Sequence, residues 1–214
     1  MPLKIQNGET ILFIGDSITD CGRRAEAKPL GTGYVKLFAD MLAIREPAKN
    51  VTIINRGIGG NRISDLRERW TDDVMRHEPD WLSVKIGIND VHGAMRDPVT
   101  GLGPGPFAEV YDGLLARTRD ALPGCRFLLI DPFYICAQDS PDPARRQVLD
   151  LLAGYIGAVH DMSRKYETRL VSTHEMFKRL LESHDAATFC PEPVHPHHTG
   201  HLAIAEWVYE ALSR

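Results

Sequence analysis

The chain has 214 residues, a length that suits one compact domain, and we expect residues 1–214 to fold as that single domain. Hydrophobic residues make up 43% of the chain and charged residues 25%, which is ordinary for a globular protein and excludes collagen-like, coiled-coil and disordered chains. With 25 Lys and Arg against 29 Asp and Glu, the net charge is −4, so nucleic acid is not an expected partner.

Two further properties of the sequence bear on its compartment. No apolar run approaches the roughly 20 residues that span a bilayer, and the first residues lack the charged-then-apolar order of a signal peptide. The cysteines form no C-x-x-C pair, which favours reduced thiols over a disulfide framework or a zinc knuckle. The sequence therefore predicts a cytoplasmic protein without a membrane span.

Short apolar runs rich in β-formers alternate along the chain with longer segments of helical periodicity. The predicted strands are 10–14, 51–55, 81–86, 127–130 and 169–172. Apolar residues recur three and four positions apart in 34–42, 63–74, 107–115, 148–162 and 204–212, which predicts helices packed on the core. This alternation is typical of an α/β fold in which helices wrap a parallel sheet of five strands.

Two segments lie outside this alternation. Residues 20–33 and 91–106 are rich in Gly, Pro and charge, and both are predicted to be ordered loops or lids. Each follows the carboxyl end of a predicted strand, which is where open α/β sheets bind their ligands. Functional residues are therefore expected at this edge of the sheet.

The sequence GDSITD at 15–20 places a serine where the chain leaves the first strand. Ser17 is then expected to be exposed at the rim of the sheet. A turn whose Asp and Ser side chains bond their own backbone explains the same hexapeptide, so this segment alone leaves both interpretations open.

Glycines dominate the segment after the second strand, NRGIGGN at 55–61. Residues such as Gly60 let backbone N–H groups approach a ligand or adopt a positive φ. The spacing matches neither the dinucleotide-binding G-x-G-x-x-G motif nor a Walker loop, so nucleotide binding is not expected.

The third strand is followed by GIND at 87–90, which brings the amide of Asn89 to the same rim. This NH2 group can donate to a developing oxyanion, although an asparagine that caps a turn is the structural alternative. Three strands thus direct Ser17, Gly60 and Asn89 to one edge. A nucleophile with convergent donors is what a tetrahedral acyl-transfer intermediate requires.

Near the C-terminal end, EPVHP at 192–196 holds a carboxylate three residues before a histidine. A serine hydroxyl is a weak nucleophile until an imidazole takes its proton, and the imidazole needs an acceptor on its other nitrogen. Ser17, His195 and Glu192 can supply that order. The alternative is that Glu192 points away and a backbone carbonyl, or a dyad, orients His195.

Histidines also cluster in this region, at positions 195, 197, 198 and 201. They raise the alternative of a metal site, but their spacing matches no zinc motif and no Cys or carboxylate accompanies them at ligand spacing. We therefore expect neither a metal nor an organic cofactor.

Four blocks together resemble the GDSL or SGNH hydrolase superfamily: GDSIT at 15–19, N-x-G-x-x-G at 55–60, GIND at 87–90 and VHP with a following Gly-His at 194–201. The resemblance spans the whole chain and implies a three-layer α/β/α fold with a flavodoxin-like, five-stranded parallel sheet. It also implies that Ser17 is the nucleophile and His195 the general base. The oxyanion hole would be the backbone N–H groups of Ser17 and Gly60 with the side chain of Asn89. The family usually has Asp three residues before the histidine, where this chain has Glu192.

Within the superfamily, FIGDSITDCGR at 13–23, LGTGYV at 30–35, GIND and DPFYI at 131–135 are similar to intracellular bacterial acetylxylan esterases. This resemblance implies a serine esterase whose substrate is a small acetylated saccharide derived from xylan, in a group whose members often form homo-oligomers. The aromatic residue frequent after GIND-Val in that group is His92 here. Two other functions stay open: a broader short-chain carboxylesterase, thioesterase or lysophospholipase, and an inactive carbohydrate-binding protein.

Overall fold

Five strands form one parallel sheet in the order β2-β1-β3-β4-β5. The computed structural model describes residues 2–137 and 140–214. The strands are β1 (Thr10–Gly15), β2 (Thr52–Gly57), β3 (Trp81–Lys85), β4 (Arg126–Ile130) and β5 (Arg169–Val171). The three central strands are mostly apolar and almost entirely buried, as expected of a parallel sheet covered on both faces.

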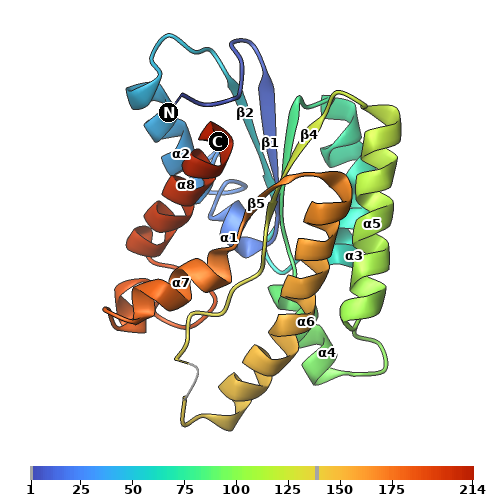
Figure 1. Ribbon diagram of the computed structural model, residues 1–214, viewed down its shortest axis with the longest axis vertical. Helices are drawn as coiled ribbons and strands as arrows, with labels where there is room; N and C mark the ends of the chain where they lie inside the picture. Colours follow the sequence, from blue (N-terminus) through green and yellow to red (C-terminus); the bar gives the residue numbers. More distant parts are fainter. Residues whose placement is uncertain (1, 138–139) are drawn as a thin grey trace.

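Helices cover both faces of the sheet. They are α1 (Ser17–Asp20), α2 (Tyr34–Arg45), α3 (Ile63–Asp73), α4 (Ile88–Arg96), α5 (Pro104–Ala121), α6 (Pro143–Tyr166), α7 (Thr173–Leu181) and α8 (His198–Ser213), with short 3-10 turns at Met75–His77 and Ala186–Thr188. In Figure 1, α2, α7 and α8 lie on one side of the sheet, and α3, α5 and α6 lie on the other. The expected three-layer α/β/α architecture is confirmed. Among the helices of the described residues, none has the length and apolar character of a bilayer span.

Aromatic side chains fill the layers between sheet and helices. Phe13 on β1 packs edge to face against Tyr34 and Phe38 of α2, with ring centroids 5.8 and 5.6 Å apart. On the other side, Phe107 of α5 packs in the same way against Tyr155 of α6, at 5.1 Å. Each of these rings is fully buried, and burying one such side chain stabilises the fold by about 1.5–3 kcal/mol. The sheet is therefore packed between two layers of helices through buried aromatic side chains.

The prediction of a loop over 91–106 is wrong in most of its length. Helix α4 continues to Arg96 and α5 already begins at Pro104, so only residues 97–103 connect them. Proline suits the first helical position. A backbone N–H has no intrahelical acceptor there, so the N–H that proline lacks is not needed. The Gly- and Pro-rich composition thus marks two helix ends. In contrast, 20–33 consists mostly of turns after α1, as expected.

The order of the strands places a topological switch point between β1 and β3. From β1 the chain first adds β2 on one side and then β3, β4 and β5 on the other. Gly15, Gly57 and Lys85 lie level in the sheet because Gly15 pairs with both of the others. Open α/β sheets bind ligands at the carboxyl ends of the strands at such a point. The segments after β1, β2 and β3 all begin at this edge.

Candidate active site

Ser17 is the first residue of the single-turn helix α1, immediately after β1. Asp16 caps this helix: its Oδ1 accepts the Ile18 N–H at 3.0 Å, and its carbonyl accepts the N–H groups of Thr19 and Asp20. The N–H of a first helical residue has no intrahelical acceptor, so the amide of Ser17 is available to a ligand. The local structure therefore presents both the hydroxyl and the N–H of Ser17 at the rim.

His195 brings its ring to Ser17 from the segment before α8. The Ser17 Oγ lies 2.9 Å from His195 Nε2, and His195 Nδ1 lies 2.5 Å from Glu192 Oε1. With Nδ1 donating to the carboxylate, Nε2 carries the lone pair that faces the hydroxyl. The three side chains thus form one line of hydrogen bonds, and of the two orientations considered for Glu192 the structure has the one that faces the ring.

The backbone of its own segment also holds the carboxylate of Glu192. Its Oε1 accepts the His195 N–H at 2.8 Å, and its Oε2 accepts the Val194 N–H at 2.9 Å. Burial opposes ionisation of Glu192, but these two N–H groups and the His195 ring outweigh it and lower the pKa of Glu192 below its ordinary value. Glu192 is therefore an anion beside the imidazole at neutral pH.

The first turn of α4 brings Asn89 to the glycine loop that contains Gly60. Asn89 is the second residue of α4, and its Nδ2 donates to the carbonyl of Asn61 at 3.1 Å, next to Gly60. Gly60 has φ +81°, and a Cβ built there would meet nothing within 4 Å, so open space lies above it. A Cβ built on the adjacent Gly59 would lie 3.9 Å from the Cβ of Ser17. The glycine loop therefore passes directly beside Ser17.

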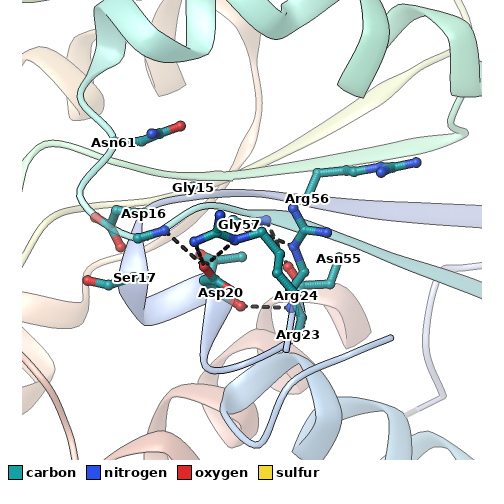
Figure 2. A network of polar contacts seen from close by, with 12 residues as sticks. Gly15, Asp16, Ser17, Asp20, Arg23, Arg24, Asn55, Arg56, Gly57 and Asn61 are labelled. Atoms are coloured by element: carbon teal, nitrogen blue, oxygen red, sulfur yellow. Dashed lines mark hydrogen bonds and ion pairs between the residues drawn. The ribbon is translucent and has the colours of Figure 1, made fainter. Parts of the chain in front are cut away.

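A polar network fixes that glycine loop against α1 (Figure 2). Asp20 Oδ2 accepts the Gly59 N–H at 2.9 Å and the Arg24 Nε–H at 2.8 Å. Asn55 accepts the Gly57 N–H at 2.9 Å and donates to the Thr19 carbonyl at 2.7 Å. Through these contacts, Asp20 and Asn55 support the glycine loop. The sequence alone does not distinguish this role from hydrogen bonding within a simple turn.

Asp90, next to Asn89, is buried and holds the starts of two helices together. Its Oδ1 and Oδ2 lie 3.1 and 3.3 Å from the Ile63 N–H, at the start of α3. Burial raises the pKa of Asp90 to about 7, although the Ile63 N–H works in the opposite direction. Asp90 belongs to the GIND motif, but the motif does not predict that its side chain is buried.

His92 borders this site, and the sequence motifs give it no role. It lies three residues after Asn89 on α4, hence on the same helix face, and its ring packs against Tyr134 with centroids 6.2 Å apart. Burial, followed by the charge of Arg96, lowers the pKa of His92. A half-buried, mostly neutral imidazole thus borders the site.

The C-terminal histidines do not converge on a common point. His195 faces Ser17, whereas the buried His201 lies 3.2 Å from Cys21 Sγ through Nε2 and accepts the Tyr34 N–H through Nδ1 at 3.3 Å. Burial lowers the pKa of His201 to about 4, which leaves it neutral. Within residues 2–137 and 140–214 there is no group of three His, Cys, Asp or Glu side chains arranged to hold a metal ion.

Comparison with known proteins identifies the family. Residues 13–203 match the GDSL-like Lipase/Acylhydrolase family. The chain is 35% identical over 213 residues to an acetylxylan esterase of Geobacillus stearothermophilus, covering 95% of this chain and 93% of that protein. The crystal structure of that organism's acetylxylan esterase Axe2 superposes with a TM-score of 0.86 at 32% identity, covering 99% and 97% of the two chains. LAE5, an α/β hydrolase enzyme from the metagenome of Lake Arreo in Spain, superposes with a TM-score of 0.87 at 28% identity, covering 99% and 98%.

The family match covers nearly the whole sheet and contains Ser17, Gly60, Asn89 and His195 within its bounds. The fold agrees with that of the solved relatives over almost their full length. The chain therefore belongs to the GDSL-like lipase/acylhydrolase family and is a hydrolase of carboxylic esters.

Proposed function

We propose that this chain is a serine esterase that removes acetyl groups from carbohydrates, with acetylated xylo-oligosaccharides as substrates, through an acetyl-enzyme on Ser17. The observation that carries the proposal is the line of hydrogen bonds from Ser17 through His195 to Glu192. Similarity to an acetylxylan esterase over 95% of the chain supports the choice of substrate.

The solved forms of Axe2 add support for the roles of individual residues. They include catalytic mutants in which a serine, an aspartate or a histidine is replaced by alanine. That aspartate and histidine stand three positions apart, as do Glu192 and His195 here. Glutamate is one methylene longer than aspartate, and here the N–H groups of Val194 and His195 hold its carboxylate.

In the first half of the reaction, Ser17 Oγ forms a bond to the acetyl carbonyl carbon while its proton passes to His195 Nε2. The negative charge that develops on the carbonyl oxygen is stabilised by the N–H groups of Ser17 and Gly60 and by the amide of Asn89. When the tetrahedral intermediate collapses, the bond to the sugar oxygen breaks and the alcohol takes the proton from His195. Acetyl-Ser17 remains.

In the second half, water attacks the acetyl carbon of acetyl-Ser17 and gives a proton to His195. A second tetrahedral intermediate uses the same donors, and its collapse releases acetate while Ser17 regains its proton. Glu192 keeps one tautomer of the imidazole throughout and stabilises the imidazolium that forms twice per turnover. The sequence of steps balances without a metal or an organic cofactor.

We assign this activity to a single domain of residues 1–214 that works in the cytoplasm. One continuous sheet and a family match over residues 13–203 support the single domain. All four cysteines lie within the described residues and all four are free, which suits a reducing compartment.

The test is hydrolysis of 4-nitrophenyl acetate and of peracetylated xylobiose by the wild type, Ser17→Ala and His195→Ala. Both substrates should be cleaved by the wild type and neither by the two variants, with circular dichroism unchanged. Ser183→Ala and His184→Ala serve as matched controls, because both residues are exposed in the turn after α7 and should leave turnover at the wild-type value. Wild-type activity in Ser17→Ala would overturn the proposal.

The choice of substrate has its own test. A series of nitrophenyl esters of increasing acyl length should show a steep fall beyond acetyl if the pocket is built for deacetylation. A plateau toward longer chains would favour the broader esterase, thioesterase or lysophospholipase. Thermal stabilisation by xylo-oligosaccharides without any turnover would instead favour the inactive carbohydrate-binding protein.

A further inference from the structure

A lysine and an aspartate form a buried ion pair directly beneath Ser17. Lys85 is the last residue of β3 and Asp16 follows the last residue of β1, and their side chains are 1% and 0% exposed. The Lys85 Nζ lies 3.2 Å from Asp16 Oδ2 and 4.8 Å from the centre of the Phe133 ring. Lysine is almost never fully buried unless it is paired, and withdrawing both charges from water is costly. A buried ion pair at this position therefore has a cost in stability that a function beside Ser17 would account for.

Asp16 divides its carboxylate between two partners. Oδ1 accepts the Ile18 N–H at 3.0 Å and so caps α1, while Oδ2 receives Lys85. Ser17 lies between Asp16 and Ile18 in the chain, inside the turn that this cap closes. Rotation of the Asp16 carboxylate therefore breaks the cap of the turn that holds the reacting hydroxyl and the first oxyanion donor.

The charge of Asp16 matters as well as its position. An unpaired carboxylate one residue from Ser17 would repel the negative charge that develops on the tetrahedral intermediate. Of the other titratable groups near Lys85, Asp131 is already occupied by the His160 ring and the Thr173 hydroxyl, and His201 is neutral because burial lowers its pKa to about 4. Lys85 is thus the cation that makes direct contact with Asp16 and offsets its charge.

We propose that Lys85 is a positioning residue of the esterase, which fixes the Asp16 cap under Ser17 and neutralises the Asp16 charge next to the developing oxyanion. The inference rests on the proposed function, because it takes Ser17 as the nucleophile. Repulsion acts on the charged transition state and hardly on a neutral ester, so Lys85 contributes to kcat and leaves KM almost unaffected.

The test compares Lys85→Met with the double variant Lys85→Met/Asp16→Asn on 4-nitrophenyl acetate. In Lys85→Met, kcat should fall on the order of thirtyfold to a hundredfold, the range that a unit charge about 6–8 Å away produces at an effective dielectric constant of about 20. In the double variant the carbonyl of asparagine still caps α1 and no charge is left unpaired. Its kcat should therefore return to within a few-fold of the wild type, with KM unchanged throughout.

Lys36→Met is the matched control, since Lys36 pairs with Asp40 in the exposed part of α2 and should leave kcat and KM unchanged. Urea titration followed by circular dichroism corrects each rate for the folded fraction. Should Lys85→Met not fold, Lys85→Gln replaces it, because glutamine keeps a donor to Asp16 but no charge, and the same loss of kcat is expected.

The outcomes separate this inference from the proposed function. An inactive Ser17→Ala together with wild-type kcat in folded Lys85→Met would overturn the role of Lys85 and leave the esterase intact. A double variant as slow as the single one would also overturn it, since removing the unpaired charge would then have had no effect. Wild-type activity in Ser17→Ala would overturn both.

Discussion

The buried carboxyl group of Asp90 makes the stability of this protein depend on pH in a direction opposite to that of most acids. Asp90 is 1% exposed, and burial raises its pKa from 3.8 to about 7. Between these two values the folded state holds a proton that the unfolded chain has already released. Stability contributed by this site is therefore present at low pH and is lost as the pH rises from about 4 to about 7.

The magnitude follows from the same two values. Each pH unit between 3.8 and about 7 is worth about 1.4 kcal/mol, so ionised Asp90 destabilises the fold by up to about 4 kcal/mol. Asp90→Asn keeps the shape and an oxygen that accepts the Ile63 N–H, but it cannot ionise. Relative to the wild type, this variant should gain up to about 4 kcal/mol in its free energy of unfolding between pH 4 and pH 8.

Urea denaturation of the wild type and of Asp90→Asn, at intervals of one pH unit, gives the difference between their free energies of unfolding. The contributions of all other titrating groups cancel in this difference. Asp112→Asn is the control of opposite sign. Hydrogen bonds from Lys165 and Tyr166 lower the pKa of Asp112, so its stabilisation is present at neutral pH and is lost as the pH falls through the folded value. A difference between Asp90→Asn and the wild type that stays flat from pH 4 to pH 8 would refute the reasoning.

Three further outcomes can be measured. Asn89→Ala should lower kcat on 4-nitrophenyl acetate on the order of 10²–10³ through loss of an oxyanion donor, and an unchanged kcat would remove Asn89 from the site. Glu192→Gln should lower kcat by up to about 10⁴, because an amide cannot accept from the His195 ring and both backbone N–H groups at once; wild-type turnover would show that another group orients His195. Phe177→Ala should cost about 3–5 kcal/mol in urea unfolding, since its ring packs 4.9 Å from both Phe133 and Trp207, and a cost below about 1 kcal/mol would contradict that packing.

The strands and most of the helices could be predicted because each one is encoded by a local apolar pattern. The sequence does not predict helix α7, since it is short and its buried residues, Thr173 and Phe177, are too few to establish a helical period. The composition of 91–106 predicts a loop because glycine and proline also occur at helix starts, where Gly103 and Pro104 stand. Local composition does not distinguish these two uses.

The candidate site was predictable where a residue acts through its own chemistry and its place after a strand, as with Ser17, Asn89 and His195. Lys85 was not, because a lysine at the end of an apolar strand is ordinarily solvated. Its burial depends on Asp16, which follows another strand and meets Lys85 only when β1 and β3 pair. The orientation of Glu192 likewise depends on the loop conformation that turns two N–H groups toward its carboxylate.

The proposed nucleophile and base are 178 positions apart in the chain, yet their side chains are 2.9 Å apart. The base reaches Ser17 from the segment that leads into α8, and α8 in turn packs on α2 across one face of the sheet. A partly unfolded molecule from which α8 has detached can keep most of its helices and strands while Ser17 has no partner. Turnover therefore reports docking of the last helix, and it measures the intact native state more stringently than helix content does.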